Sequence, residues 1–155
     1  MRPLVIYYSR TGNTKKVAEA ISSALKCDSE EISDTKKRKG PVAYLAAARD
    51  AMRKNQTEIN PIQKDLGTYD LIIVGTPVWS WTVSTPIRTF LQQHKKQIKN
   101  VAFFLTHGGN FKNTFEDMAN ILGKKPLGTF EMHEKDLKNG IDNQGLENFI
   151  NKLNK

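Results

Sequence analysis

A hydroxyl-rich turn near the N-terminus carries the residues that are best suited to bind a ligand. Residues 4–8 before it are apolar, β-branched and aromatic, which is typical of a buried strand, and apolar residues recur after it at helical spacing. A turn that joins a strand to a helix N-terminus presents unpaired backbone N–H groups and the positive end of the helix dipole. The sequence therefore predicts an anion site, for which phosphate is the best ligand. The turn reads Ser9-Arg10-Thr11-Gly12-Asn13-Thr14.

Within this turn, hydroxyl and amide side chains add hydrogen-bond groups, Gly12 permits a close approach or a positive φ, and Arg10 contributes its backbone N–H. The motif is not a P-loop, because it has no Gly-Lys pair, nor a dinucleotide fingerprint, because it has one glycine. A tyrosine-phosphatase-like site needs an arginine six residues after its cysteine, but Ser33 stands at that distance from the single cysteine, Cys27. An ordinary strand-to-helix turn without a ligand stays open as the alternative.

The composition fits one globular domain, residues 1–155, with 38% hydrophobic and 26% charged residues. A single cysteine excludes an intramolecular disulfide and a multi-cysteine metal site, and no metal site is expected. The sequence shows no signal peptide and no apolar run of membrane length, so we expect a cytoplasmic protein without a membrane span. The net charge of +8 is spread over many segments, and it indicates a solvated lysine surface or an acidic partner rather than nucleic acid.

Strand-type and helix-type segments alternate along the chain. The expected strands span residues 4–8, 28–32, 70–75, 101–106 and 127–133. The expected helices cover residues 14–25, 44–52, 85–91, 115–122 and 146–153, and the basic run 36–39 with Gly40-Pro41 is expected to be a loop. This alternation predicts an α/β fold, a three-layer α/β/α sandwich around a five-stranded parallel sheet in the doubly wound order 2-1-3-4-5.

In a sheet of this order, ligands bind beyond the carboxyl ends of the strands, where the loops after the first, third and fourth strands converge. The first of these loops is the hydroxyl-rich turn. The second, expected at residues 76–84, has two tryptophans, and exposed tryptophans are costly unless they cover something. The third has a Gly-Gly pair that suits a close backbone wall. A flat aromatic ligand that carries a phosphate fits this combination.

Three motifs in this order resemble those of the flavodoxin family. They are the hydroxyl-rich turn, the run Gly75-Thr76-Pro77-Val78-Trp79 followed by the helix from Thr85-Pro86, and Thr106-His107-Gly108-Gly109. The resemblance covers nearly the whole chain and implies FMN as the cofactor. The cofactor-binding residues that it implies are Ser9, Arg10, Thr11, Gly12, Asn13, Thr14, Thr76, Pro77, Val78, Trp79, Ser80, Trp81, Thr106, His107, Gly108 and Gly109.

Several single residues have two interpretations. Trp79 and Trp81 are each expected either to contact the flavin or to be a plain core or surface residue, and the sequence leaves open which of the two stacks on the ring. His107 is either a solvated side chain or, when protonated, a group that stabilises an anionic reduced ring. His94 and His133 are expected on the surface. Catalytic residues are not assigned by these patterns.

The resemblance implies that FMN transfers electrons between protein partners, in a protein that we expect to be monomeric. Carriers of this family are typically acidic, so the basic charge of this chain favours an acidic partner such as a ferredoxin-like protein. Carriers of this family commonly stabilise the one-electron-reduced flavin through a backbone flip in the second flavin loop, which glycine eases. No glycine lies between Thr76 and Pro86, so the resemblance implies weak stabilisation of that state and favours two-electron transfer. Two alternatives stay open: an FMN-dependent NAD(P)H or quinone oxidoreductase, and a non-redox binding module that has lost its flavin.

Overall fold

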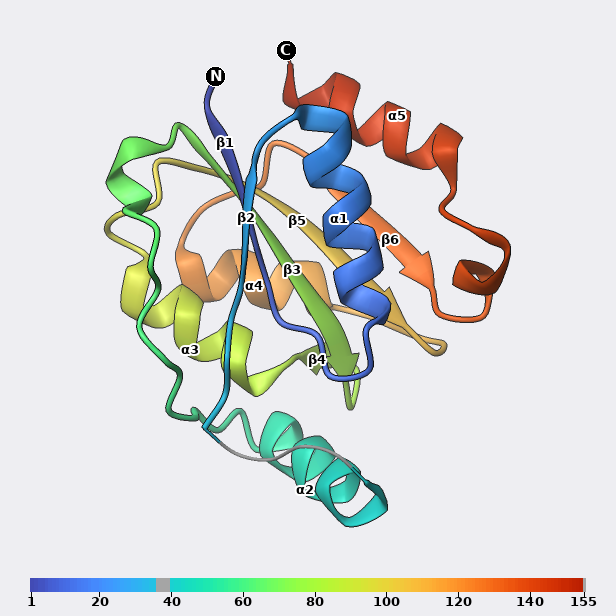
Figure 1. The fold of residues 1–155 in the computed structure, drawn as a ribbon. Coiled ribbons are helices and arrows are strands. Elements are labelled where there is room, and N and C mark those ends of the chain that lie inside the picture. The colour runs from blue at the N-terminus through green and yellow to red at the C-terminus, as the bar shows by residue number, and fades with distance from the viewer. Residues whose placement is uncertain (36–39, 155) are drawn as a thin grey trace.

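The computed structural model describes residues 1–35 and 40–154, so the predicted loop at 36–39 lies outside the described residues. A central sheet is covered by helices on both faces (Figure 1). The strands are β1 (Pro3–Tyr7), β2 (Asp28–Glu31), β3 (Leu71–Trp79), β4 (Thr82–Val83), β5 (Asn100–His107) and β6 (Thr129–His133). The helices are α1 (Asn13–Leu25), α2 (Pro41–Met52), α3 (Thr85–His94), α4 (Thr114–Leu122) and α5 (Asn143–Leu153), with 3₁₀ turns η1 (Leu66–Thr68) and η2 (Asp136–Asn139).

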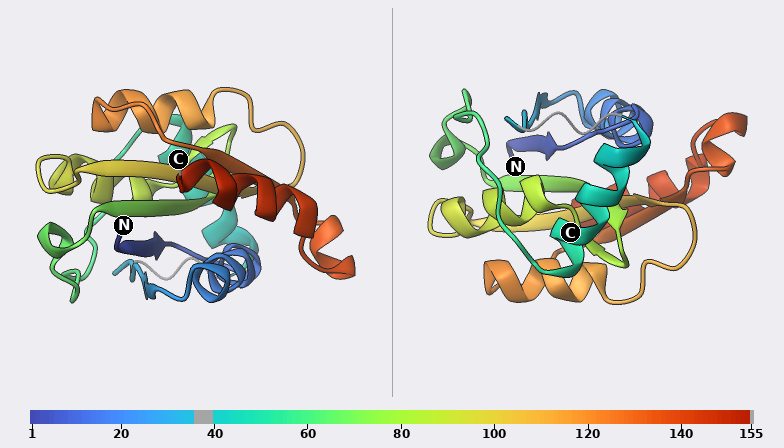
Figure 2. Two further views of the ribbon diagram at one scale, coloured as in Figure 1. Left: turned by 90° about the horizontal axis from the view of Figure 1, so that it is seen from above. Right: turned by 90° about the horizontal axis from the view of Figure 1, so that it is seen from below.

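The predicted sheet order is confirmed. Five parallel strands follow the order β2-β1-β3-β5-β6, which is the doubly wound order with β4 attached to β3. Strand β3 lies in the middle, and its residues Leu71–Pro77 are buried because helices cover both faces of the sheet. The three-layer arrangement is visible in Figure 2, where the strands lie between two groups of helices.

Each face of the sheet has its own hydrophobic core. Helices α1 and α5 pack on one face through residues such as Val17 and Phe149, together with Phe104 of β5. Helices α3 and α4 pack on the other through residues such as Phe90 and Met118. This division follows from the strand alternation, which points successive side chains to opposite faces.

The prediction of a loop at residues 76–84 is wrong. Strand β3 continues through Trp79 and turns back into β4, which pairs with it antiparallel. The connection is the two-residue turn Ser80-Trp81, and both residues have positive φ, 49° and 62°. Such a turn matches the twist of a hairpin but normally carries Asn or Gly, so the sequence contains no hairpin signal here.

Helix α2 lies beyond the carboxyl end of the sheet, beside the hairpin, whereas both chain termini lie at the opposite end (Figure 1). It begins at Pro41, three residues before the predicted start, because the fixed φ of proline suits the first turn of a helix. No helix among the described residues is long and apolar enough to span a membrane. Helix α2, the hairpin and the loops after β1 and β5 therefore all lie at the carboxyl end of the sheet.

Candidate functional site

The hydroxyl-rich turn leaves several backbone N–H groups without an acceptor among the residues that the structure describes. Ser9 Oγ accepts hydrogen bonds from the backbone N–H groups of Gly12 (3.1 Å) and Lys15 (3.2 Å), which folds the turn around the start of α1. Gly12 has φ 94°, a conformation that a side chain would strain. Among the described residues, the N–H groups of Arg10 and Thr11 have no acceptor in the protein, and neither do the first two N–H groups of α1. A phosphate would supply the missing acceptors.

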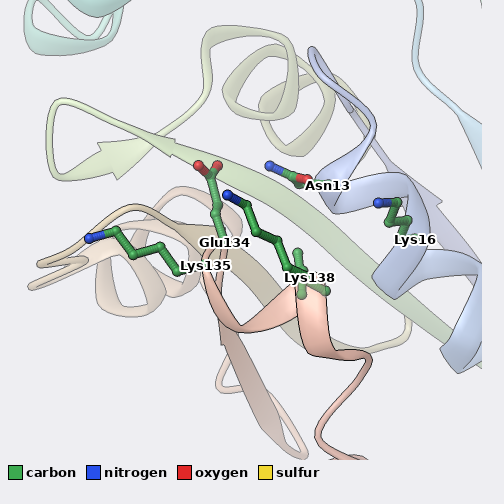
Figure 3. Close-up of a pocket in the computed structure, with 6 residues that line it drawn as sticks. Asn13, Lys16, Glu134, Lys135 and Lys138 are labelled. Carbon is green, nitrogen blue, oxygen red and sulfur yellow. The ribbon is translucent and has the colours of Figure 1, made fainter.

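Positive charge lies next to this turn. Asn13 and Lys16 of α1 face the connection after β6 across a cavity of about 380 Å³ (Figure 3). Lys135 and Lys138 line the same cavity, together with Glu134. The ion pairs found within residues 1–35 and 40–154 include none of these three lysines. Unpaired lysines raise the positive potential at the turn and favour an anionic ligand.

The predicted cofactor-binding residues fall into three groups by exposure. Exposed residues are Thr11, Trp81, Gly108 and Gly109; half-buried residues are Ser9, Arg10, Gly12, Asn13, Val78 and Ser80; buried residues are Thr14, Thr76, Pro77, Trp79, Thr106 and His107. The buried polar members hold the loops together. Thr14 Oγ1 and Thr106 Oγ1 are 2.8 Å apart and join α1 to the end of β5. Thr76 Oγ1 donates to the carbonyl of Pro77 at 2.8 Å.

The two tryptophans have opposite environments. Trp79 is 5% exposed and packs edge-on against Tyr8, with the ring centres 5.5 Å apart. Trp81 is 62% exposed at the tip of the hairpin. A stacking ring needs a free face, and in this structure Trp81 has one and Trp79 does not, a point that the sequence left open.

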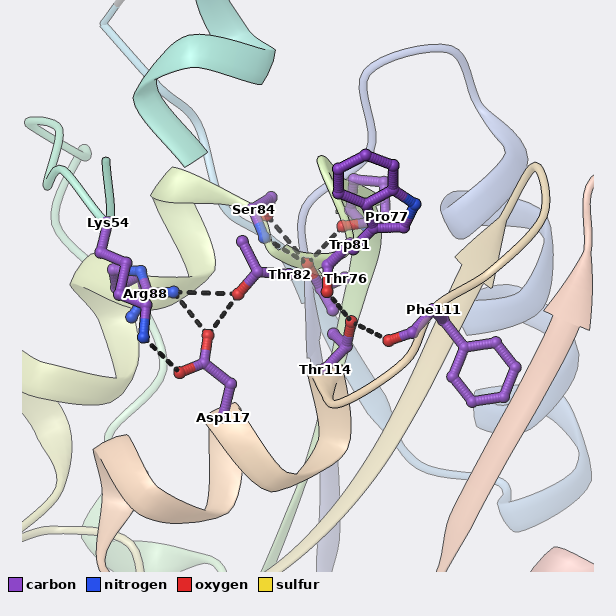
Figure 4. Close-up of polar contacts among 10 residues, drawn as sticks. All are labelled: Lys54, Thr76, Pro77, Trp81, Thr82, Ser84, Arg88, Phe111, Thr114 and Asp117. Carbon is purple, nitrogen blue, oxygen red and sulfur yellow. Dashed lines mark hydrogen bonds and ion pairs between the residues drawn. The ribbon is translucent and has the colours of Figure 1, made fainter. Parts of the chain in front are cut away.

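A buried polar network fixes the hairpin that carries Trp81 (Figure 4). Arg88 of α3 forms an ion pair with Asp117 of α4 at 2.6 Å, and Thr82 hydrogen bonds to the same carboxylate. The carbonyl of Trp81 accepts a hydrogen bond from Thr114 at 3.2 Å. Burial by itself raises the pKa of Asp117, but the hydrogen bonds from Thr82 and Arg88 and the charge of Arg88 outweigh it and lower the pKa. The network therefore joins the hairpin that carries Trp81 to α3 and α4.

His107 is buried, which is against the first of its two interpretations, a solvated side chain. It belongs to the end of β5, and its Nε2 hydrogen bonds to Glu131 of β6. The rings of Phe111 and His133 lie 4.7 and 5.0 Å from its ring centre and pack against it. His133 and His94, which were predicted on the surface, are half-buried, because the first packs on His107 and the second on Phe90.

Four residues of this region were not found from the sequence. Arg88, Asp117 and Glu131 make contacts between distant segments, and no motif marks them. Tyr44 of α2 lies under the guanidinium of Arg10, 4.9 Å from its ring centre. Cation–π pairs of this kind depend on tertiary placement and leave no sequence pattern.

The described residues give little support for a metal site or a reactive cysteine. The described residues contain no group of three or more His, Cys, Asp or Glu side chains that could hold a metal ion. Burial, with a smaller contribution from Asp28, raises the pKa of Cys27 to about 11. The Cys27 thiol is therefore protonated at neutral pH and packs beside the core.

A family model described as Flavodoxin matches residues 2–153. The chain belongs to the flavodoxin family. A flavoprotein from Lactobacillus acidophilus NCFM, solved in complex with FMN, is 29% identical, with 89% of this chain and 97% of that chain covered and a TM-score of 0.70. A flavodoxin from Megasphaera elsdenii, solved in the two-electron reduced state, is 16% identical with a TM-score of 0.62 (93% and 94% covered) and shows a shared fold.

A protein named NAD(P)H dehydrogenase (quinone) from Cupriavidus metallidurans is 29% identical over 130 residues, which cover 77% of this chain. This flavodoxin-family chain spans 65% of the length of that relative. The hydroxyl-rich turn, the hairpin and the Gly-Gly loop lie at one end of the sheet because they follow, or end, the parallel strands β1, β3 and β5.

Proposed function

We propose that this flavodoxin-family protein binds FMN at the carboxyl end of its sheet and transfers electrons between protein partners. The observation that carries the proposal is the pairing of a turn with unsatisfied N–H groups and an exposed tryptophan at the same end of the sheet. The first suits a phosphate and the second suits a flat aromatic ring. The FMN complex of the Lactobacillus acidophilus relative supports the same ligand.

Each part of the site has a separate task in this proposal. The N–H groups of Arg10 and Thr11 bind the phosphate, and Lys16 adds positive charge beside it. Trp81 covers one face of the ring, while the exposed Gly108-Gly109 backbone lines its edge. FMN supplies the redox chemistry when bound, and the protein orients it and excludes water.

A second candidate function is the reduction of quinones with NAD(P)H as the electron donor. It is favoured by the name of the Cupriavidus metallidurans relative and by the lysine-lined cavity next to the turn, which suits a phosphorylated donor. The carrier and the reductase share the same flavin site. They differ in whether a pyridine nucleotide reduces the bound flavin without another protein.

The deciding experiment starts with the visible spectrum of the purified protein before and after addition of FMN. A 1:1 complex that releases FMN on heating supports the flavin site, and a protein that remains colourless contradicts it and leaves a non-redox binding module. Rates of NADH and NADPH oxidation with a quinone then separate the two functions. Rapid turnover supports the reductase. Reduction only through an added electron-transfer protein supports the carrier.

Replacing Trp81 with alanine is expected to weaken FMN binding by about 1–3 kcal/mol, because the ring loses its stacking partner. Stability of the FMN-free protein is expected to change little, since Trp81 is 62% exposed. Trp79→Phe serves as the control, with a loss of about 1–2 kcal/mol in unfolding free energy and an unchanged FMN affinity. Fluorescence titration and urea unfolding measure the two quantities. If Trp79→Phe weakened FMN binding and Trp81→Ala did not, Trp79 would be the stacking residue.

Replacing Thr11 with alanine is expected to weaken FMN binding by about 1.5–3 kcal/mol, because the hydrogen bond from its hydroxyl to a charged phosphate is lost while its backbone N–H stays in place. Thr11 is exposed, so its substitution leaves the core intact. Riboflavin has no phosphate and provides the control ligand. Calorimetric titration is expected to show an effect for FMN and none for riboflavin, and equal losses with both ligands would contradict the assignment.

A further inference from the structure

Helix α2 has an unusual outer face. Val42, Leu45 and Met52 are 82%, 69% and 66% exposed and follow helical spacing. The opposite face of the same helix packs on the protein through Ala47 and Ala51, which are almost fully buried. A helix with apolar residues on both faces is normally buried on both, so the outer face of α2 lacks a partner in the described chain.

Exposed apolar side chains concentrate in this part of the molecule. The large hydrophobic side chains that are exposed in the described residues are Met1, Val42, Tyr44, Leu45, Met52, Trp81 and Leu127. All except Met1 and Leu127 belong to α2 or to the adjoining hairpin. A concentration of this kind is typical of a surface that binds another molecule.

This surface is continuous with the proposed flavin site. Tyr44 of α2 contacts the Arg10 guanidinium in the hydroxyl-rich turn at 4.9 Å. On the other side, Ser80 Oγ donates a hydrogen bond to the carbonyl of Ala48 at 3.1 Å, one residue before Trp81 in the hairpin. A molecule that binds the outer face of α2 would therefore lie next to the flavin.

The charges around the apolar stripe are positive. Arg49 lies on the same helix face as Leu45, and Arg53 follows at the end of the helix; both are exposed. The acidic residue of α2, Asp50, is buried on the inner side. Hereafter the α2 face means Val42, Leu45, Arg49, Met52 and Arg53. Its chemistry complements a surface with an apolar centre and an acidic rim.

We propose that the α2 face is the docking surface for an acidic electron-transfer protein, an inference that rests on the proposed function. A second copy of this chain fits less well, because a two-fold interface on this face would place Arg49 and Arg53 against their own copies. Docking here brings the donor beside Trp81 and the flavin. Two donor molecules would each lose one electron, and FMN would gain both electrons together with two protons from water.

The test uses the FMN-loaded protein and a chemically reduced, acidic [2Fe–2S] ferredoxin as the probe, with flavin reduction followed by stopped flow. Leu45→Glu is expected to lower the second-order rate constant about tenfold or more, because it places a charge in the apolar centre and repels the acidic rim. Leu127→Glu is the matched control, since Leu127 is 45% exposed and precedes β6 at the opposite end of the sheet. Its rate constant is expected to equal that of the wild type.

Charge reversal gives an independent measurement. Arg49→Glu is expected to lower the rate constant about tenfold at low ionic strength and to weaken its salt dependence, whereas Lys96→Glu, after α3, is expected to leave both unchanged. Equal rates for wild type, Leu45→Glu and Arg49→Glu would overturn the proposal. If the wild type is a dimer and Leu45→Glu is a monomer, the face binds a second copy of the chain. If the wild type sediments with anionic vesicles and Leu45→Glu does not, the face binds a membrane.

Measurements of FMN binding separate an error about the α2 face from an error about the proposed function. FMN affinity and reduction by dithionite are measured for every variant, and both are expected to match the wild type for Leu45→Glu and Arg49→Glu. If the wild type does not bind FMN, the proposed function fails. If every variant binds FMN and accepts electrons from ferredoxin at the wild-type rate, the assignment of the α2 face alone fails.

Discussion

Replacing Asp117 with alanine is expected to lower the free energy of unfolding by about 3–5 kcal/mol, because it leaves the charge of Arg88 buried without its partner. The Arg88 side chain is 4% exposed and that of Asp117 is 18% exposed, so water cannot substitute for the lost carboxylate. Thr82 also loses its hydrogen bond to this carboxylate. Urea unfolding measures the change, and the variant should also bind FMN more weakly, since the network holds the hairpin that carries Trp81.

Lys54→Gln is the matched control, because Lys54 contacts the other oxygen of Asp117 at 3.9 Å with a side chain that is 65% exposed. A change of no more than about 0.5 kcal/mol is expected. The double substitution Arg88→Met and Asp117→Leu removes both charges and is expected to recover much of the loss. If Asp117→Ala were as stable as the wild type, the network would have no role in stability.

The contribution of Asp117 depends on pH. Its pKa in the folded protein lies below the ordinary value of 3.8, so the folded state favours the ionised carboxylate. The resulting stability is present above about pH 4 and is lost as the pH falls through the folded-state pKa. The stability difference between wild type and Asp117→Asn is therefore expected to be constant near neutral pH and to shrink below about pH 4.

Replacing Gly75 with alanine is expected to lower the free energy of unfolding by about 3 kcal/mol or more, at the upper end of the cost of overpacking. Gly75 lies in the central strand β3, opposite Phe104 of β5. A Cβ at this position would overlap the Phe104 ring, which is fully buried and has no free space to move into. Denaturant unfolding measures the loss.

Gly109→Ala is the control for this substitution, because no atom lies within 4 Å of the added Cβ and its φ is outside the left-handed region. Its unfolding free energy is expected to match that of the wild type. Adding Phe104→Leu to Gly75→Ala makes room for the methyl group, and the combined loss is expected to be smaller than the sum of the two single losses. Strict additivity would show that Phe104 is not the obstacle.

The sequence alone was sufficient to predict the order of the five parallel strands and five helices, the sheet topology and the position of the hydroxyl-rich turn. These features rest on local signals. Apolar runs such as residues 70–75 mark central strands, helical spacing marks the buried face of a helix, and a strand-to-helix turn exposes N–H groups whatever the rest of the chain does. Once the topology follows from the alternation, the convergence of the three loops follows as well.

Four features came from the three-dimensional arrangement alone: which tryptophan is exposed, the hairpin at residues 78–83, the burial of His107 and the apolar outer face of α2. Trp79 and Trp81 are two residues apart, and the positive φ of Ser80 and Trp81 places one in the core and the other in solvent. The partners of Arg88 and His107 are 29 and 24 residues away. Such contacts depend on which segments meet when the sheet forms, and no local pattern of residue types encodes them.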